Sequence, residues 1–182
     1  GLGDVYKRQV GAFVHPSYPS KIGTRVTVAL ATVNIGGAFE MGIARGIEQA
    51  CQDRGWELLI YDARLSAELE ASNLTRLVDS GTRGAIISPL SDHLNLEILF
   101  KLKLSGYPMV LVDRGVPGLK VDLVESDHEK AAYLATEHLL THGHRQVFMV
   151  TWPPLATSIT ARIRGFEQAL IAYGQEPSRN RM

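Results

Sequence analysis

The sequence has a single cysteine, no excess of charge and no long apolar run, and each absence excludes a class of protein. Cys51 alone forms no disulfide within the chain, which fits a reducing compartment. The 19 basic and 19 acidic residues cancel, so the chain as a whole has no electrostatic footprint for nucleic acid. No apolar run approaches the roughly 20 residues of a membrane span, and no secretory leader is visible. We therefore expect a cytoplasmic protein with no membrane partner.

Motifs of nucleotide-binding and hydrolytic enzymes are absent as well. Asn34-Ile35-Gly36-Gly37 follows the first strand-like run and Asp62 ends the second, an arrangement with a superficial likeness to a dinucleotide-binding fold. The two glycines are adjacent, however, so the G-x-G-x-x-G spacing of the pyrophosphate turn is missing. The sequence also has no P-loop and no G-x-S-x-G nucleophile elbow. We predict that the protein is not an enzyme.

A group of three histidines raises the alternative of a metal site. His138 and His142 have the i, i+4 spacing that holds a metal on a helix. His142, however, falls in the last turn of a predicted helix, where an imidazole favours the negative end of the helix dipole. The only further ligand nearby is His144, past a glycine bend. We predict neither a metal nor another cofactor.

From residue 26 onward the sequence alternates short apolar runs with helical segments. The apolar runs are rich in Val, Ile, Leu and Met, which is typical of strands buried on both faces of a parallel sheet. Such alternation predicts an α/β fold with a doubly wound parallel sheet. Strands are expected at 26–32, 57–61, 85–88, 109–112, 121–124 and 147–150, and helices at 39–54, 67–80, 93–105, 128–142 and 158–173.

The predicted helices have recognisable ends. A glycine follows each one, where a left-handed residue closes the last turn without a side-chain clash. Polar residues that favour the N-cap position precede several of them. The glycines are Gly55, Gly81, Gly106, Gly143 and Gly174, and the candidate N-caps are Ser66, Asp92, Asp127 and Thr157.

Polar side chains gather at the predicted carboxyl ends of the strands, where open parallel sheets bind ligands. Carboxylates and guanidinium groups suit pairs of hydroxyls, and aromatic rings such as Phe39 and Trp152 suit an apolar ligand face. The alternative is structural, with Asp127 and Ser66 only capping helices and Asp62 in a surface loop. The residues concerned are Thr32, Asn34, Asp62, Ser88, Asp113, Arg114, Ser126, Asp127, Thr151 and Trp152.

Six short segments occur in an order and spacing that is more specific than any one of them. They are A-R-G-I-E at 44–48, D-R-G-W at 53–56, G-A-I-I-S-P at 84–89, V-L-V-D-R at 110–114, A-T-E-H-L-L-T-H-G-H-R at 135–145 and S-I-T-A-R-I-R-G-F at 158–166. From about residue 26 to 174 the chain resembles the sugar-binding effector domain of the LacI/GalR family. The resemblance implies a periplasmic-binding-protein-like type I fold, in which two α/β lobes close on a sugar or related metabolite.

The resemblance also implies how the chain is divided. Residues 1–25 are expected to be linker-like and partly derived from a cloning or sequencing linker. Residues 26–144 would form the first lobe, and 145–182 the beginning of a truncated second lobe. The N-terminal helix-turn-helix and most of the second lobe are expected to lie outside this sequence.

Candidate ligand-binding residues follow from matching positions in the resemblance. Asp127 matches the acid that opens a helix, and Arg162, three residues before Gly165, matches the arginine that grips ligand from the second lobe. Departures such as His128 in place of Asn, Gly37-Ala38 in place of Asn-Pro, and Trp152-Pro153-Pro154 in place of a glycine-rich turn leave the ligand open. The full set is Asn34, Phe39, Ser88, Asp113, Asp127, Trp152, Ser158 and Arg162.

The resulting expectation is an effector-binding domain of a transcriptional regulator, homodimeric when intact, that reaches operator DNA only through the N-terminal domain outside this sequence. The alternative is an extracytoplasmic sugar-binding receptor of a transporter with the same fold. Gly143-His144-Arg145 and the preceding E-H-L-L favour the regulator. A third class, an α/β enzyme, needs a nucleophile or base that the sequence does not offer.

Overall fold

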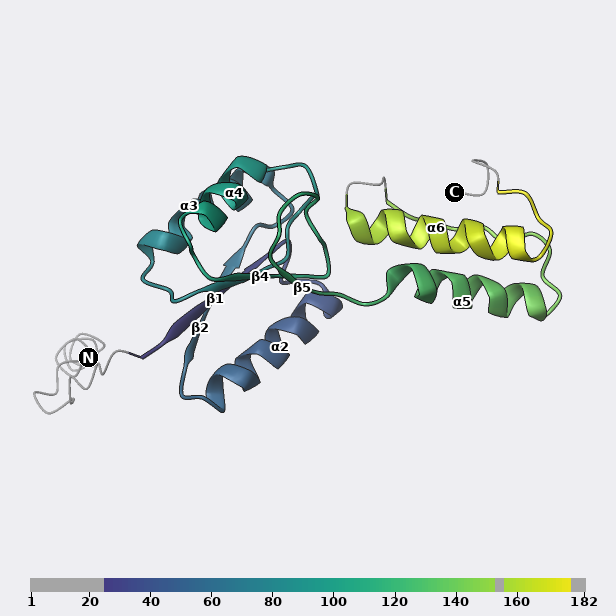
Figure 1. The fold of residues 1–182 in the computed structure, drawn as a ribbon. Coiled ribbons are helices and arrows are strands. Elements are labelled where there is room, and N and C mark those ends of the chain that lie inside the picture. The colour runs from purple at the N-terminus through teal and green to yellow at the C-terminus, as the bar shows by residue number, and fades with distance from the viewer. Residues whose placement is uncertain (1–24, 153–155, 178–182) are drawn as a thin grey trace, which may run out of the picture.

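The computed structural model describes residues 25–152 and 156–177. In these ranges five strands form one parallel sheet in the order β2-β1-β3-β4-β5. This confirms the predicted fold class (Figure 1). The strands are β1 (Thr27–Thr32), β2 (Glu57–Asp62), β3 (Ala85–Ile87), β4 (Met109–Val112) and β5 (Asp122–Val124), and the helices are α2 (Ala38–Gln52), α3 (Ala67–Asp79), α4 (Leu96–Leu104), α5 (His128–Thr141) and α6 (Thr157–Ala172). The predicted linker before Arg25 and the Pro153-Pro154 turn lie outside the described residues.

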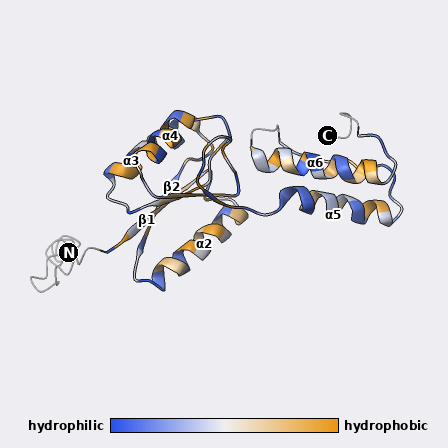
Figure 2. Ribbon diagram, in the orientation of Figure 1, coloured by the Kyte–Doolittle hydropathy of each residue, from blue (hydrophilic) through white to orange (hydrophobic). Residues whose placement is uncertain are grey.

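Helices cover the sheet on both sides, as a doubly wound fold requires. Figure 1 shows α3 and α4 over one face and α2 over the other. The main hydrophobic core lies under α3 and α4, where Leu74, Leu99 and Leu111 are at most 1% exposed. Figure 2 shows hydrophobic and hydrophilic residues mixed along α2, α3 and α4. This is the pattern of helices with one face on a core and the other in solvent.

Helices α5 and α6 form a separate layer beyond the sheet. They start beside it and run away from it side by side (Figure 1). A second, smaller cluster of buried side chains, Leu140, Val147, Phe166 and Leu170, lies in this layer. Gly165 lets the helices approach closely, because a Cβ there would overlap the main-chain oxygen of Glu129.

The main packing partner of α5 is α6 and not the sheet. The family resemblance placed α5 in the first lobe, within residues 26–144. In the structure α5 turns its buried residues Thr136 and Leu140 toward α6 instead. The edge strand β5 is left with little cover, and Val124 is 64% exposed. Periodicity shows that a helix has an apolar face but does not show which surface that face meets.

The prediction of a strand at 147–150 is wrong for the described residues. No β-ladder includes this segment. Its side chains do alternate, with Val147 buried in the cluster between the helices while Phe148 is 63% and Val150 99% exposed. The apolar run indicated a strand, but a strand also needs a hydrogen-bonded neighbour, which the described chain does not supply.

The sequence predicts where the helices end better than where they begin. All five glycines that follow helices have positive φ, between 65° and 90°, as predicted. Ser66 caps α3 by accepting the Leu69 N–H at 3.1 Å, and Asp127 caps α5 by accepting the Lys130 N–H at 2.9 Å. The other two predicted caps are wrong, because α4 begins after Asn95 and α6 begins after Ala156. No helix in the described ranges is long and apolar enough to cross a bilayer.

Candidate functional site

A cleft of about 380 Å³ opens between the start of α5 and the first half of α6. It begins at the carboxyl end of β5, where the chain leaves the sheet. Its lining residues are Glu125, Ser126, Asp127, His128, Glu129, Ala161 and Arg164. The volume falls within the range of small-molecule sites. Asp127 is the predicted ligand-binding residue that lies in this cleft.

A larger hollow of about 760 Å³ lies on the opposite side of the fold. Its walls include Val26, Gly84 and Pro108, which come just before strands β1, β3 and β4. None of the predicted ligand-binding residues lines it. Because ligands of open parallel sheets bind at the carboxyl ends of strands, we take the cleft at α5 and α6 as the candidate site.

Asp113 ends β4 in an unusual conformation. Its φ is 66°, in the left-handed region that non-glycine residues rarely occupy, and the residue is 7% exposed. One carboxylate oxygen, Oδ2, lies 3.3 Å from Nε of Arg114. The other, Oδ1, is buried and accepts no hydrogen bond within the described residues. Nε2 of His128 lies 3.3 Å from this oxygen but forms no hydrogen bond to it, so the buried oxygen is only weakly compensated.

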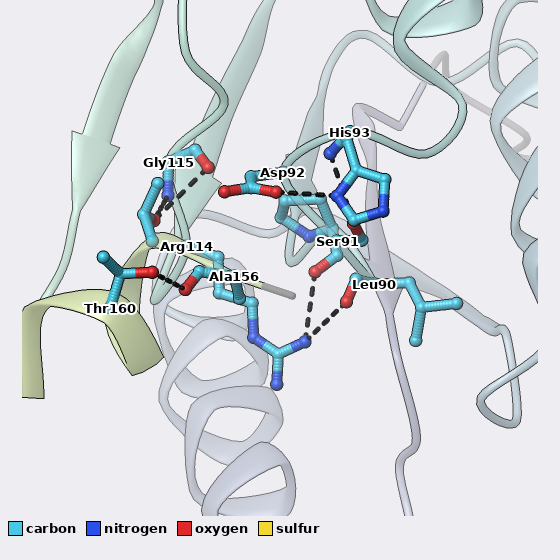
Figure 3. Close-up of polar contacts among 10 residues, drawn as sticks. Leu90, Ser91, Asp92, His93, Arg114, Gly115, Ala156 and Thr160 are labelled. Atoms are coloured by element: carbon cyan, nitrogen blue, oxygen red, sulfur yellow. Dashed lines mark hydrogen bonds and ion pairs between the residues drawn. The ribbon is translucent and has the colours of Figure 1, made fainter. Parts of the chain in front are cut away.

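Arg114 fixes this end of β4 to the neighbouring loop. Its Nη1 donates to the main-chain oxygens of Leu90 at 3.0 Å and Pro89 at 3.3 Å (Figure 3). Such charge-assisted bonds to carbonyl oxygens are stronger than neutral ones. The loop after β3 and the loop after β4 therefore form one unit.

Glu70, which the sequence analysis did not single out, holds the loop after β3 from the other side. Its Oε1 accepts the Leu90 N–H at 2.6 Å and its Oε2 accepts Nδ2 of Asn95 at 2.6 Å. Glu70 is 5% exposed. A signal was present in the sequence, since Glu70 lies four and seven residues before Leu74 and Leu77, on the apolar face of α3.

A hydrogen bond joins this loop unit to the helix pair. The Gly115 N–H donates to Oγ1 of Thr157 at 2.9 Å, and the same hydroxyl lies 3.4 Å from the Gly115 carbonyl oxygen. Figure 3 shows this contact beside Arg114 and the first turn of α6, where Thr160 donates to the Ala156 oxygen at 3.4 Å. Thr157, predicted as an N-cap, serves as the link between the two layers.

His128 makes a second connection at the same junction. It is the first residue of α5 and is 5% exposed. Its Nε2 lies 3.2 Å from the main-chain oxygen of Asp113 and 3.3 Å from Oδ1 of the same residue. The neighbouring Glu129 is bound by α6, through Arg164 at 3.1 Å and Gln168 at 2.7 Å. The amino end of α5 is thus connected to both the sheet and α6.

The other residues predicted to bind ligand differ in how far they are buried and in whether they form hydrogen bonds. Ser158 is 1% exposed, directly after the linking Thr157, and Arg162 is half-buried with no hydrogen bond or ion pair within the described part of the chain. Phe39 is 54% exposed at the start of α2, and Trp152 is 81% exposed.

Two further predicted residues are engaged within the sheet layer. Ser88 is 6% exposed and lines a narrow crevice with Thr32 and Asn73. Oδ1 of Asn34 accepts the Gly36 N–H at 3.1 Å and shapes the loop after β1. The structure therefore connects Asp113, Asp127 and the start of α6 in one junction. It shows no hydrogen bond that joins the described side chains of Asn34, Phe39, Ser88 or Trp152 to it.

The histidines at the end of α5 lie away from this junction. The rings of His138 and His142 are 4.2 Å apart between centroids. Nδ1 of His142 lies 2.7 Å from the main-chain oxygen of His138, so it is engaged with the last turn of the helix. Within the described residues no group of three potential ligands is placed to hold a metal ion.

Comparison of the sequence with protein families and curated proteins gives one consistent result. Residues 36–182 match the family of periplasmic binding proteins and the sugar-binding domain of the LacI family. The chain is 31% identical over 142 residues to the HTH-type transcriptional regulator PtxS of Pseudomonas putida, an alignment that covers 76% of this chain and 40% of the relative. It is 27% identical to the transcriptional repressor PurR of Aliivibrio fischeri, with 83% and 44% covered. The chain thus spans less than half the length of these relatives.

Solved structures share the fold. The CcpA regulator of Lactococcus lactis superposes with a TM-score of 0.78 at 22% identity, covering 86% of this chain and 57% of that one. The CelR regulator in complex with cellobiose gives 0.74 at 26% identity, with 86% and 50% covered. The Caulobacter myo-inositol binding protein gives 0.76 at 20% identity, with 84% and 53% covered. On the family match over most of its length, this chain belongs to the family of periplasmic binding proteins and LacI-type sugar-binding domains.

Proposed function

We propose that the chain is part of the effector-binding domain of a transcriptional regulator and that a sugar or related small molecule binds at the cleft between α5 and α6, beside the carboxyl end of β5. The observation that carries the proposal is the polar junction of Asp113, His128 and Thr157 at the carboxyl ends of the strands. A ligand there would contact the segment 125–127, which links the sheet to the helix pair, as well as α5 and α6. Its binding free energy would then depend on how the layers are arranged, as allosteric coupling requires.

The packing of the helices suggests where the two lobes divide. We place the first lobe from residue 26 to Val124 and the start of the second at His128, earlier than the boundary at residue 144 expected from the sequence. The support is that α5 shares its buried side chains with α6. The link between the lobes is then the short segment 125–127, which also borders the cleft.

The names of the curated relatives favour a regulator over a transporter receptor. Relatives at 27% and 31% identity carry the names of transcriptional regulators. The myo-inositol binding protein, at 20% identity, supports the shared fold alone. In this proposal operator DNA is bound by an N-terminal domain outside this sequence, the intact protein is a cytoplasmic homodimer, and no reaction is catalysed.

Calorimetry on the protein expressed from its complete reading frame tests the proposal. The titrants are cellobiose, myo-inositol, D-glucose and D-ribose, the first two chosen from the ligands of structural relatives. Saturable binding of at least one is expected. Arg162→Ala should then weaken that binding by roughly 1.5–3 kcal/mol, as loss of a charge-assisted hydrogen bond does. Arg76→Ala, on the distant helix α3, is the matched control and should leave the affinity unchanged. Absence of binding across the panel, or turnover of any of these sugars, would contradict the proposal.

A further inference from the structure

The protonation pattern of His128 follows from what surrounds its ring. Both atoms near Nε2 are acceptors, namely the main-chain oxygen of Asp113 at 3.2 Å and its carboxylate Oδ1 at 3.3 Å. A carbonyl and a carboxylate oxygen supply no hydrogen, so Nε2 must carry one and donate it. When the ring is neutral, the other nitrogen, Nδ1, then has a free lone pair.

His128 lies at the candidate site. No further hydrogen bond of the His128 ring occurs within the described residues, and His128 lines the cleft between α5 and α6. The residue is 5% exposed, so bulk water has little access to its ring. A ring nitrogen without a protein partner is available to a ligand that donates a hydrogen to it.

The charges around the cleft restrict what that ligand is. Three carboxylates line it, those of Glu125, Asp127 and Glu129, against one guanidinium, that of Arg164. Arg164 is already paired with Glu129, and Asp127 accepts the Lys130 N–H at the amino end of α5. No unpaired cation remains among the lining residues. An anionic group placed there would face the lining carboxylates, Glu125 among them, whereas hydroxyl groups would find acceptors.

We propose that His128 is a specificity-determining residue whose Nδ1 accepts a hydrogen bond from a hydroxyl of a neutral polyol, with Asp113 fixing the tautomer. This inference rests on the proposed function, because it assigns a ligand class to the same cleft. If Arg162 also reaches the ligand, its guanidinium donates to hydroxyl oxygens, which is compatible with an uncharged molecule. Sugar acids and sugar phosphates are disfavoured because they add negative charge beside Glu125.

Two substitutions separate the two nitrogens of the ring. In His128→Gln the side-chain amide replaces Nε2 and keeps a donor toward Asp113, but the acceptor at the Nδ1 position is lost. In His128→Asn the amide replaces the Nδ1 position and the contact with Asp113 is lost. We expect His128→Gln to lower the affinity for the best-binding neutral sugar of the panel by about tenfold, the effect of one hydrogen bond, and thermal melting to show that it stays folded.

Nitrogen-15 NMR of histidine-labelled wild-type protein gives a readout that does not depend on a variant. The expected spectrum shows the Nε2–H tautomer for His128, and the Nδ1 resonance moves when the neutral sugar is added. D-gluconate and D-glucose 6-phosphate, titrated alongside D-glucose, should bind more weakly than D-glucose. The inference is overturned if the ring is an Nδ1–H tautomer, if Nδ1 does not respond, or if either anion binds more tightly. Those outcomes leave the proposed function intact, whereas absence of all sugar binding removes both.

Discussion

Gly115 donates its main-chain N–H to the hydroxyl of Thr157 at 2.9 Å, and this single bond spans 42 positions of the sequence. It joins the loop after β4 to the first residue of α6. The two residues belong to different layers, so their bond reports directly on how the layers are held together.

Replacing Thr157 with Val keeps the shape of the side chain and removes the hydroxyl. The Gly115 N–H then loses its partner, and we expect the free energy of unfolding to fall by about 1 kcal/mol. Hydrogen exchange at the Gly115 amide should become faster, which mass spectrometry detects. Thr141→Val is the control, because that exposed hydroxyl bonds only within its own helix end. Unchanged exchange at Gly115 would show that the bond does not hold the layers.

The contact between α5 and α6 depends on the lack of a side chain at Gly165. Gly165→Ala places a methyl group against the main-chain oxygen of Glu129, so the helices must separate. We expect a loss of about 1–3 kcal/mol in urea unfolding, as for overpacked cores. Gly46→Ala, in α2, has open space around the added group and should stabilise the protein by up to about 1 kcal/mol. Equal changes in the free energy of unfolding for the two variants would contradict the close packing of α5 on α6.

The buried carboxylate of Glu70 supports the loop that Arg114 also binds. Glu70→Ala leaves the Leu90 N–H and the Asn95 amide without their acceptor, and a loss of about 2–4 kcal/mol is expected. Glu70→Gln keeps one acceptor oxygen and should cost less. The same change to Ala at exposed Glu68 should leave the unfolding midpoint nearly unchanged. If Glu70→Ala and Glu68→Ala have the same unfolding midpoint, Glu70 does not support the loop.

Burial raises the pKa of the Cys51 thiol, an effect only partly opposed by the charge of Arg54. The folded protein therefore holds the thiol in its protonated form, and alkylation by iodoacetamide should be much slower than after unfolding in urea. Because the pKa of the thiol is higher in the folded than in the unfolded protein, the stability linked to this group is fully present below the unfolded pKa and is lost as the pH rises from there through the folded pKa. Cys51→Ala should reduce that decline. Equal alkylation rates in the folded and unfolded protein would contradict burial of the thiol.

The segment 147–150 presents apolar side chains without a strand partner among the described residues. Unpaired backbone beside exposed Phe148 and Val150 favours association between copies. We expect the 182-residue chain to self-associate as its concentration rises and to bind sugars poorly. The double substitution Phe148→Thr with Val150→Thr should reduce the association, as measured by sedimentation velocity. A monomer at every concentration with full sugar affinity would contradict this expectation.

The features that follow local rules were predictable from the sequence. The alternation of apolar runs and helices gave the parallel sheet, and glycine after each helix marked where each one stops, because both depend on neighbours along the chain. The six spaced segments led to the family, which the match over residues 36–182 confirms. Asp127 was expected at a helix start and is found there.

The features that depend on contacts distant in sequence were not predictable. No local sequence pattern indicates that α5 packs on α6. None indicates that the Thr157 hydroxyl bonds to Gly115 instead of capping its own helix. His128 was noted only as a departure from the family pattern, and its significance depends on the oxygen atoms of Asp113, 15 residues earlier. The positive φ of Asp113 likewise has no signature in the residues around it.

The two connections between the layers have a mechanical consequence. One is the covalent segment 125–127, with His128 against Asp113, and the other is the bond from Gly115 to Thr157. Two points define a line, and rotation about that line stretches neither connection. We expect rotation of the helix pair about this line to be the easiest relative motion of the two layers. A ligand that contacts the segment 125–127 together with α5 and α6 would restrain this rotation, and the displacement would be largest at the far ends of the two helices.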